Sequence, residues 1–585
     1  MFHTGRNARE VAATMPAGID AALDIETPSV TDSFTIKCVT ASWEQHGELH
    51  TVLLDPLRRE DDAAAVRTIV SRARWLVLHS SPFDIPGLVA AKLMTLDDIG
   101  KVMDTLLLAR AAWPDSFERK GLEALAPKLL GLPGGDGALK AAIKASGLGS
   151  KAKWFAKGDI DMPTYRRGAM SDTAVTLRLA YPLYEAACRR MLDHPFSTYG
   201  ATDMAGASAI IDRLLRVNRV FLRRAAKGYA VDLDYLDTYV DKVTAARFEA
   251  EKALTAAGCR PGNGLDVVTK LDAEGALPAN WGRTPTGRLK ADKKAMEMLP
   301  DHPLALAHLK VAHTRKVIGY MEKTVDRSAV TGRLHPQFSV LGASATGRMS
   351  ASEPEVQQFP EDARPIIRAD EGRGFTSVDW SSIEPALMAW MARDWDFITP
   401  FEQGADIYEP IQRLANIPRK QAKVLMLALM YNQGKASTAA SLKTDTDTAM
   451  DIKYRVLNAM PVTAGYMRKI KAIAGQYGLV ITVSGRILPM EQYNGVFSDH
   501  KAVNAAAQGS CADMMYHAVD LCDQAGLGDH VHLSLHDELV VDTEVAEEVE
   551  RIMQTPPPEL IARAGGRRPV IRTDSHDLGS CWNIC

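Results

Sequence analysis

The clearest change of hydrophobic pattern along the chain lies within residues 375–394. Residues 375–378 have the β-branched and aromatic content of a short strand, and apolar side chains then recur at helical spacing through residues 387–391. The pattern predicts a strand that turns directly into a helix. Asp379 stands at the junction, where a rigid strand end presents a carboxylate to solvent, and we expect it to be one ligand of a metal site.

The first turn of this predicted helix carries a glutamate. Ser381 and Glu384 have the spacing of a capping box, and Pro385 is tolerated in a first helical turn. We therefore expect the side chain of Glu384 to be fixed beside the end of the strand. Capping alone would explain the residue, and a second use as part of a site is compatible with it.

A strict alternation of apolar and polar side chains runs through residues 531–536, and a second apolar strand follows at once. This pattern predicts a β-hairpin with His536 and Asp537 in its tight turn. Asp379 and Asp537 lie 158 residues apart, so only tertiary folding can bring their carboxylates together. If they meet, they can hold two Mg²⁺ ions, with Glu538 in support. A lone aspartate in a hairpin is otherwise a turn former.

Acidic residues also mark the N-terminal third, where residues 20–54 alternate strand-like runs with turns. The first run carries two acidic residues two positions apart, so a strand directs both to one face. A third follows an apolar strand, and a fourth lies in a predicted helix. These candidate ligands are Asp24, Glu26, Asp84 and Asp172. An exposed polar edge is the alternative for the first pair, and we expect the nearby Asp104 to cap a helix rather than bind a metal.

Two long helical patterns occupy the middle of the chain. Residues 210–232 are amphipathic and basic, residues 281–299 form a second basic stretch, and residues 308–325 predict another long helix. The basic side chains of the first helix are Arg213, Arg216, Arg219, Arg223 and Arg224. Long helices with basic connections suit a thumb that grips a phosphate backbone, and a solvated helix face is the alternative.

A third helical pattern begins after Pro418, a residue suited to a helix start. Arg419, Lys423, Leu427 and Tyr431 recur every four residues and form one stripe along it. Two cations in the first turns oppose the helix dipole. A bound triphosphate would offset this cost, because the same helix end attracts phosphate.

Composition narrows the class of protein. The chain has 585 residues, 46% hydrophobic and 24% charged, which predicts several globular domains. Its net charge of −3 means that any nucleic acid must be held by local basic patches. The seven scattered cysteines argue against a zinc site or a disulfide framework. Without a signal-peptide pattern or an 18-residue apolar run, we expect a cytoplasmic enzyme and no membrane partner.

The N-terminal third resembles the DEDD family of 3′–5′ exonucleases. DIET at residues 24–27 matches its first motif, HSSPFD at 79–84 its second, and the aspartate of MSDTAVT at 170–176 its third. The resemblance implies that the four carboxylates hold two divalent metals when the site is active. The family places Tyr four residues, or His five residues, before the last aspartate, where this chain has Gly168 and Arg167. We therefore expect weakened proofreading, with Tyr165 an imperfect substitute.

The rest of the chain resembles family A DNA polymerases, the bacterial polymerase I class. TGRMS at residues 346–350, DWSSIE at 379–384, the helix at 419–434 and LHDELV at 535–540 follow the family order. VNAAAQGSCADMM at 503–515 and a terminal GSCW extend the match. The resemblance implies a bacteriophage-type enzyme for genome replication. Because only 23 residues precede Asp24, we expect no 5′-nuclease region.

The resemblance also implies roles for individual residues. Asp379, Asp537, Glu538 and Lys423 would be catalytic, with the two aspartates as metal ligands. Nucleotide contacts would come from Arg419, Lys423, Leu427, Tyr431, Glu384 and His536. Contacts with primer or template would come from Arg348, Arg364, Asn504, Gln508 and His536. Glu384 would exclude a ribose 2′-OH, and the minor-groove contacts would check shape rather than sequence.

We expect a multidomain fold of α/β and α+β type, an RNase H-like exonuclease domain followed by a right-hand polymerase domain. The expected divisions are 1–192 exonuclease-like, 193–208 linker, 209–331 thumb and start of the polymerase domain, 332–400 palm, 401–498 fingers and 499–585 palm. Expected cofactors are Mg²⁺ ions, two at the polymerase site and two at the exonuclease site, with Mn²⁺ as an alternative. Expected partners are primer–template DNA and dNTPs, bound by a monomer; no processivity factor is indicated.

Two other functions are compatible with parts of this pattern. One is an enzyme that is mainly a 3′–5′ exonuclease, with a DNA-holding C-terminal module. The pairs Asp379/Asp537 and Arg419/Lys423 count against it. The other is a single-subunit RNA polymerase, against which the exonuclease motifs and Glu384 count.

Overall fold

The computed structural model describes residues 1–29, 32–114, 118–132, 137–194, 196, 200–430, 433–442 and 444–583. These residues form two compact units. The first contains residues 1–228, 337–351 and 373–577, and the second contains residues 229–336, 352–372 and 578–585. The predicted domain divisions stay predictions.

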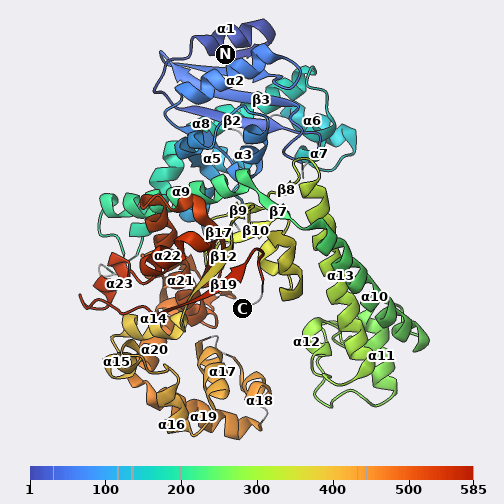
Figure 1. The fold of residues 1–585 in the computed structure, drawn as a ribbon, viewed down its shortest axis with the longest axis vertical. Helices are drawn as coiled ribbons and strands as arrows, with labels where there is room; N and C mark the ends of the chain where they lie inside the picture. The colour runs from blue at the N-terminus through green and yellow to red at the C-terminus, as the bar shows by residue number, and fades with distance from the viewer. Residues whose placement is uncertain are drawn as a thin grey trace. The chain divides into compact units, whose positions relative to one another are not determined.

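The N-terminal part of the first unit contains a mixed six-stranded sheet in the order β1-β4-β3-β2-β5-β6 (Figure 1). Its strands are β1 (Phe2–Thr4), β2 (Ala21–Glu26), β3 (Cys38–Gln45), β4 (Glu48–Leu54), β5 (Leu76–Leu78) and β6 (Val102–Asp104). β2 pairs antiparallel with β3 and parallel with β5. The strand runs predicted within residues 20–54 are therefore confirmed.

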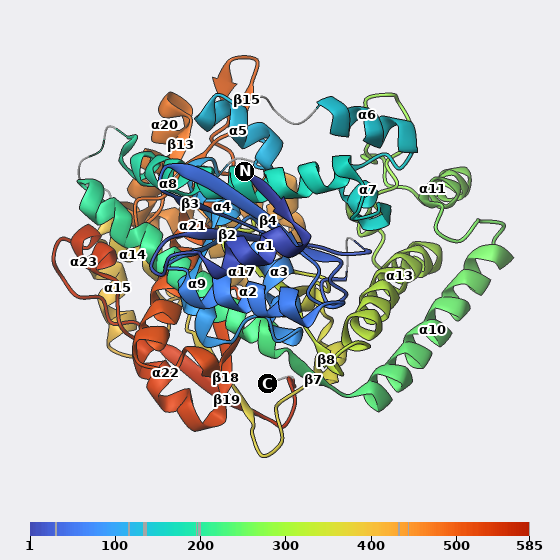
Figure 2. The same ribbon diagram turned by 90° about the horizontal axis from the view of Figure 1, so that it is seen from above.

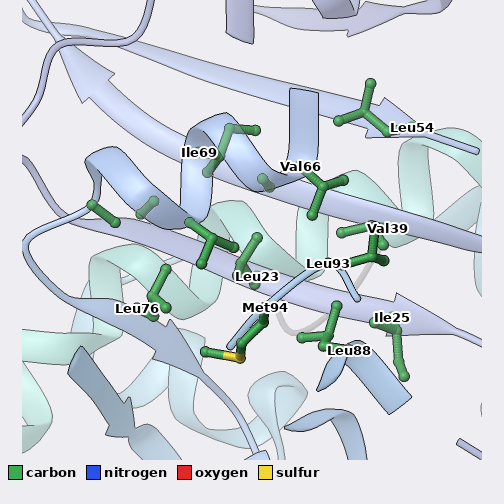
Figure 3. Packing of buried hydrophobic residues seen from close by; sticks show 14 of the residues in the cluster. Leu23, Ile25, Val39, Leu54, Val66, Ile69, Leu76, Leu88, Leu93 and Met94 are labelled. Atoms are coloured by element: carbon green, nitrogen blue, oxygen red, sulfur yellow. The ribbon is translucent and has the colours of Figure 1, made fainter. Parts of the chain in front are cut away.

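The faces of this sheet are covered by helices that bury its apolar side chains. The helices are α1 (Gly5–Ala13), α2 (Glu60–Arg72), α3 (Ser81–Ala90), α4 (Thr105–Ala112), α5 (Leu122–Leu130), α6 (Gly137–Ser146), α7 (Lys151–Lys157), α8 (Pro163–Leu192) and α9 (Met204–Lys227). Leu23 and Val39 of the strands pack with Val66 and Ile69 of α2 in a single core (Figure 3). Seen from above, α1 and α2 lie over the sheet (Figure 2). α8 buries Tyr165 against Cys38 in a separate cluster.

α9 is the basic amphipathic helix that the pattern predicted, but its arginines serve the protein interior. Arg216 Nε donates to Asp520 at 2.6 Å, Arg223 Nε donates to Asp529 at 2.8 Å, and Arg213 pairs with Glu559 at 3.0 Å. Arg219 Nε donates to the carbonyl oxygen of Val102, and Arg224 is buried. The prediction that these arginines form a phosphate-gripping face was wrong, because they bind residues elsewhere in the first unit and join α9 to it.

A second sheet in the first unit has the order β17-β18-β12-β19. Its strands are β12 (Phe375–Trp380), β17 (Val531–Leu535), β18 (Glu538–Asp542) and β19 (Thr573–Gly579). The helices beside it are α14 (Ile383–Ala392), α21 (Ala502–Gln524), α22 (Ala546–Met553) and α23 (Pro558–Arg563). The buried Trp380 donates its indole N–H to the carbonyl oxygen of Met553 at 2.8 Å, which ties β12 to α22. Both the predicted strand-to-helix junction and the predicted hairpin are confirmed.

The segment between α14 and α21 is mainly helical. It contains α15 (Trp395–Glu402), α16 (Glu409–Ala415), α17 (Arg419–Met430), α18 (Lys435–Leu442), α19 (Thr446–Ala459) and α20 (Pro461–Tyr477). Short strands follow as the pairs β13 (Leu479–Ile481) with β14 (Ile487–Pro489), and β15 (Gln492–Tyr493) with β16 (Val496–Phe497). A further pair joins β9 (Gln337–Ser339) to β10 (Ser350–Ser352). The helix predicted from residue 419 is confirmed as α17.

The second unit is built on two long helices that run side by side, α10 (Leu233–Ala256) and α13 (Pro303–Ser328) (Figures 1 and 2). Shorter helices α11 (Gly264–Ala273) and α12 (Lys293–Met296) pack with them, and Val267, Val268 and Met296 belong to their shared core. The small sheet of this unit has the order β11-β7-β8, from Ile367–Arg368, Tyr229–Val231 and Arg333–Leu334. The long helix beside α13 is thus α10, not the α9 segment that the sequence pattern emphasised.

Across the part of the chain that the structure describes, no helix combines the length and the apolar content needed to cross a membrane.

Candidate active sites

The register of β12 and β18 brings three carboxylates together. Asp379 pairs directly with Glu538 across the two strands. The backbone N–H of Trp380 donates to the carbonyl oxygen of Asp537 at 3.2 Å, so Asp537 lies beside the end of β12. The 158 residues between the two aspartates are therefore bridged by a strand pairing.

The hairpin turn that presents Asp537 has a left-handed backbone. His536 has φ of 57° at the two-residue turn between β17 and β18. Two-residue hairpin turns favour positive φ because this twist matches the flanking strands. The turn leaves His536 exposed and Asp537 half-buried. A rigid, open support of this kind holds a ligand in place without closing the site.

The electrostatics of this cluster favour a cation. Burial raises the pKa of Asp379 to about 7, and the charges of Asp537 and Glu538 add to the rise. Burial also raises the pKa of Asp537. Oδ1 of Asp379 is buried and accepts no hydrogen bond from any described residue. A buried oxygen without a partner, next to two further carboxylates, fits the oxygen ligands that hard divalent cations take.

Two neighbours shape the cluster from either side. Ser377 Oγ donates to Glu538 Oε1 at 2.7 Å, which fixes that carboxylate on the sheet. Asp574, on β19 at the other edge of β12, raises the pKa of Asp379 further. The sequence gives no signal for Asp574, because a lone aspartate in a polar strand has no distinctive spacing.

The predicted capping box is wrong. The N-cap of α14 is Ser382, which has φ of 50° and makes no side-chain cap, and the hydroxyl of Ser381 donates to Asp574. Glu384 instead accepts from Arg348 Nη2 at 2.8 Å, with both side chains mostly buried. The left-handed turn at Ser382 moves the helix start by one residue, and so Ser381 cannot reach the backbone of Glu384. Glu384 is fixed beside the cluster, as expected, but by an ion pair.

Arg348 joins Glu384 to the hairpin. Its Nη1 lies 3.3 Å from Nδ1 of His536. Arg486 holds the loop that carries Arg348, because it donates to the carbonyl oxygen of Thr346 in that loop. Arg486 also donates to the carbonyl oxygen of Gly509 and forms an ion pair with Asp513. This buried ion pair has no sequence signal, since its members lie 27 residues apart.

α17 carries two of the predicted nucleotide-binding cations, Arg419 and Lys423. Lys423 is exposed, and its charge lowers the pKa of Asp537, whereas Leu427 is half-buried. Arg419 pairs with Asp406 and lies 5.5 Å from the ring centroid of Tyr408. Tyr431 lies outside the described residues. Arg419 and Lys423 are both exposed on α17, Arg419 is held by an acidic neighbour, and the full stripe through Tyr431 stays a prediction.

The remaining predicted contacts have mixed positions. Asn504 and Gln508 lie half-buried on α21, and Oδ1 of Asn504 is buried without a hydrogen-bond partner among the described residues. Arg364 belongs to the second unit, where its guanidinium lies 4.9 Å from the ring of Trp582. The roles of all three as DNA contacts stay predictions.

The four acidic residues predicted as metal ligands in the N-terminal third line one cavity of about 1050 Å³. They come from β2, α3 and α8, and are Asp24, Glu26, Asp84 and Asp172. Oδ1 of Asp84 accepts the backbone N–H of Ile25 at 3.0 Å, which ties α3 to β2. Burial raises the pKa of each of the four carboxyl groups. Four carboxylates around one cavity fit divalent cations as well as the first cluster does.

Two other predictions in this region can be resolved. Asp104 accepts the backbone N–H groups of Leu106 and Leu107, so the predicted helix cap is confirmed. Tyr165 is fully buried between Trp154 and Phe155 and is not among the described residues that line the cavity. It therefore does not take the place of the missing tyrosine.

Lysine 151 is the site residue that the sequence did not reveal. Its Nζ donates to Oδ1 of Asp172 at 2.9 Å, and it lines the same cavity. No local signal marks it, because it lies 21 residues from its partner in a segment of several lysines.

Comparison with known proteins identifies the polymerase region. The model of DNA polymerase family A matches residues 267–561, half of the chain. The DNA polymerase of Mycobacterium phage L5 is 25% identical over 549 residues, which cover 90% of this chain and 87% of that protein. The DNA polymerase I of Rhizobium leguminosarum is 27% identical over 477 residues, covering 74% of this chain and 44% of that protein.

Among solved structures, the chain is similar in fold to the POL domain of Pol1 from M. smegmatis, determined in complex with DNA primer-template and dNTP. The TM-score is 0.72 at 20% identity, with 99% of this chain and 98% of that chain covered. The family resemblance read from the sequence motifs is confirmed for the polymerase region. The matching family model and both of these relatives are DNA polymerases, which favours this interpretation over the RNA polymerase alternative. This chain belongs to DNA polymerase family A.

Proposed function

We propose that the chain extends the 3′-OH of a DNA primer along a template, with dNTPs as substrates and two Mg²⁺ ions held by Asp379 and Asp537. The observation that carries the proposal is the pairing of β12 with β18, which sets Asp379 opposite Glu538 and beside Asp537. Oδ1 of Asp379 is buried there and has no hydrogen-bond partner among the described residues. Family membership supports a requirement for divalent metal in general. The choice of Mg²⁺ and the count of two follow from the chemistry of phosphoryl transfer.

Asp379 and Asp537 would hold the cations, which when bound would lower the pKa of the primer 3′-OH and offset the negative charge of the departing pyrophosphate. The chain's own residues supply position and charge. The carboxylates of Asp379 and Asp537 are fixed at the end of a sheet, and Glu538 is kept in place by Ser377. Lys423 presents a positive charge toward the triphosphate, because it stands exposed on α17 and acts on the charge of Asp537.

The Arg348–Glu384 pair supports a role in sugar selection. Glu384 is fixed in the first turn of α14 by an ion pair of 2.8 Å. A carboxylate held in one position beside the metal ligands can reject a ribose 2′-OH by contact, which a mobile side chain could not do. The proposed substrate is therefore the deoxynucleotide.

Primer extension tests the polymerase proposal. The wild type should extend a primed template with dNTPs and Mg²⁺ and should extend poorly with rNTPs, while Asp537→Ala should not extend. Circular dichroism and thermal unfolding of the variant serve as the control for folding. Undiminished extension by Asp537→Ala would overturn the assignment of the site.

We propose a second activity for the N-terminal cavity, the removal of nucleotides from single-stranded 3′ ends. Four carboxylates around a cavity of about 1050 Å³ favour it. Asp24→Ala should abolish degradation of a 5′-labelled single strand and leave primer extension intact. Absence of degradation by the wild type would mean that the cavity is not an exonuclease site.

Similarity to a mycobacteriophage DNA polymerase over 87% of that protein supports genome replication in a bacteriophage as the setting. Primer–template DNA is the proposed partner of a monomeric enzyme in the host cytoplasm. Size-exclusion chromatography with light scattering, with and without a primed template, tests the monomer.

A further inference from the structure

Lys151 occupies a fixed place in the N-terminal cavity. It is the first residue of α7, and its Nζ lies 2.9 Å from Oδ1 of Asp172 and 4.0 Å from the carboxylate of Glu123. Asp24 and Glu26 line the same cavity. A cation thus stands among the carboxylates proposed to bind metal.

The packing of α7 fixes this position. Trp154 and Phe155 are buried and contact the ring of Tyr165, with ring centroids 5.8 Å and 4.9 Å away. At the other end of the helix, Nζ of Lys37 donates to the carbonyl oxygens of Phe155 at 3.0 Å and Ala156 at 3.3 Å. Lys151 is therefore carried by an anchored helix rather than by an open surface.

Gly168 makes this packing feasible. A Cβ atom at this position would lie 2.8 Å from Cζ of Phe155 and 3.2 Å from Cδ2 of Leu139. Gly168 is four residues before Asp172, the position from which a side chain on α8 would point toward the same site. In this chain the ring of Phe155 fills that space. The helix that fills it is the one that delivers Lys151.

We propose that Lys151 is a catalytic residue of the exonuclease site, and that its ammonium group donates hydrogen bonds to a non-bridging oxygen of the scissile phosphate. The proposal rests on the exonuclease function proposed above. In the reaction the oxygen of water bonds to phosphorus, the P–O3′ bond breaks, and its electron pair stays on O3′. The proton that water loses and the proton that O3′ gains exchange with solvent. Lys151 stays protonated throughout.

An ammonium group differs from a phenol in this place. It carries a full charge and three donors, so it stabilises the negative charge that develops on the phosphate oxygens. It also offsets part of the negative charge that attracts a divalent cation to the cavity. Removing it should therefore weaken catalysis while strengthening metal binding, a pair of opposite effects that loss of structure cannot produce.

The test compares Lys151→Met, Lys151→Arg and a control, Lys153→Met, whose side chain is exposed on the same helix. Degradation of a 5′-labelled single strand gives kcat and KM. Mn²⁺ affinity is measured by calorimetry in the Asp537→Ala background, which removes binding at the polymerase site. We expect Lys151→Met to lower kcat about 100-fold and to raise Mn²⁺ affinity roughly tenfold. Lys151→Arg should keep most of the activity, and Lys153→Met should match the wild type.

Three results would overturn the proposal. An undiminished kcat for Lys151→Met would show that the ammonium does not act on the reaction. A joint loss of kcat and Mn²⁺ affinity would show that Lys151 only maintains the shape of the cavity. Both of these results leave the exonuclease function intact, provided that the wild type degrades single strands and Asp24→Ala does not. Absence of degradation by the wild type removes the exonuclease function and this role together.

Discussion

The first unit contains two groups of carboxylates that are built in different ways. In the proposed polymerase site, Asp379, Asp537 and Glu538 come from adjacent strands and one hairpin turn. In the N-terminal cavity the four carboxylates come from a strand and two helices, and Lys151 pairs with one of them. The polymerase group thus depends on strand register, whereas the cavity depends on how helices pack on a sheet.

The two groups also differ in where positive charge comes from. The N-terminal cavity contains a cation that is held by packing. The polymerase group has Lys423 on the exposed face of α17 and Arg348 bound to Glu384, and Asp379 keeps an oxygen without a partner. The comparison suggests that the polymerase group relies on bound metal and substrate for neutralisation, while the cavity is partly neutralised by the chain itself.

Replacing a proposed metal ligand should have the largest effect on one activity while leaving the other unchanged. Asp379→Asn keeps the shape of the side chain but removes a charge, and we expect it to lower the rate of primer extension by about 10³-fold or more. Single-turnover extension kinetics measure the change, and the degradation of single strands is the control that should not change. A loss of less than tenfold would contradict the assignment.

The exposed cation of α17 should come next. Lys423→Met should lower kcat of extension by about 100-fold, because a charge aimed at the triphosphate is lost in the transition state. Lys420→Met is the matched control, since Lys420 is exposed one position into the same helix. Equal rates for the two variants would show that Lys423 has no special place in the reaction.

Sugar selection should show a smaller effect. Glu384→Ala removes the group that we propose rejects the 2′-OH, so the preference for dNTPs over rNTPs should fall by roughly 10- to 100-fold. The measurement is the ratio of kcat/KM for dGTP and GTP on one template. An unchanged ratio would show that other residues discriminate between the two sugars. If only the rate with dNTPs falls, the cause would be Arg348, which loses its ion-pair partner in this variant.

The pH dependence of stability tests the charge difference without any reaction. Burial raises the pKa of Asp379 to about 7 and also raises that of Asp24, so the folded state holds protons that the unfolded state has lost above pH 4. Without metal, stability should therefore fall as pH rises from about 4 to 7. Thermal unfolding in EDTA measures this fall, which Mn²⁺ should reverse. Asp379→Asn and Asp24→Asn should each make stability depend less on pH. An unchanged pH dependence in both variants would contradict the raised pKa values of these two aspartates.

The smallest effect should come from Gly168→Ala. The added Cβ would press on the ring of Phe155 and shift α7, and the displacement should lower the exonuclease rate several-fold while extension stays unchanged. Exonuclease and extension assays on the same preparation give both numbers. A variant with full exonuclease activity would show that the position of Lys151 tolerates movement of its helix.

Local pattern predicted much of the fold. The strand-to-helix junction at Asp379, the hairpin at Asp537 and the helix from Arg419 follow from periodicity within ten to fifteen residues, and all three were found. The same holds for the cap at Asp104. Such features need only short-range interactions, which a sequence displays directly.

Features set by distant partners could not be read in advance. The arginines of α9 looked like a basic surface, yet Arg216 meets Asp520, 304 residues away. Ser381 found Asp574 rather than its expected neighbour. Lys151 donates to Asp172 from a helix whose Phe155 packs over Gly168. In each case tertiary packing selected a partner that local spacing does not indicate.

One experiment tests most directly the claim that two independent carboxylate sites act on a DNA end. A 5′-labelled primer with a mismatched 3′ end, annealed to a template, is incubated with wild type, Asp537→Ala or Asp24→Ala, with and without dNTPs. The wild type should shorten the primer without dNTPs and lengthen it with them. Asp537→Ala should only shorten it, and Asp24→Ala should never shorten it. Lengthening by Asp537→Ala, or loss of both reactions in either variant, would contradict the account.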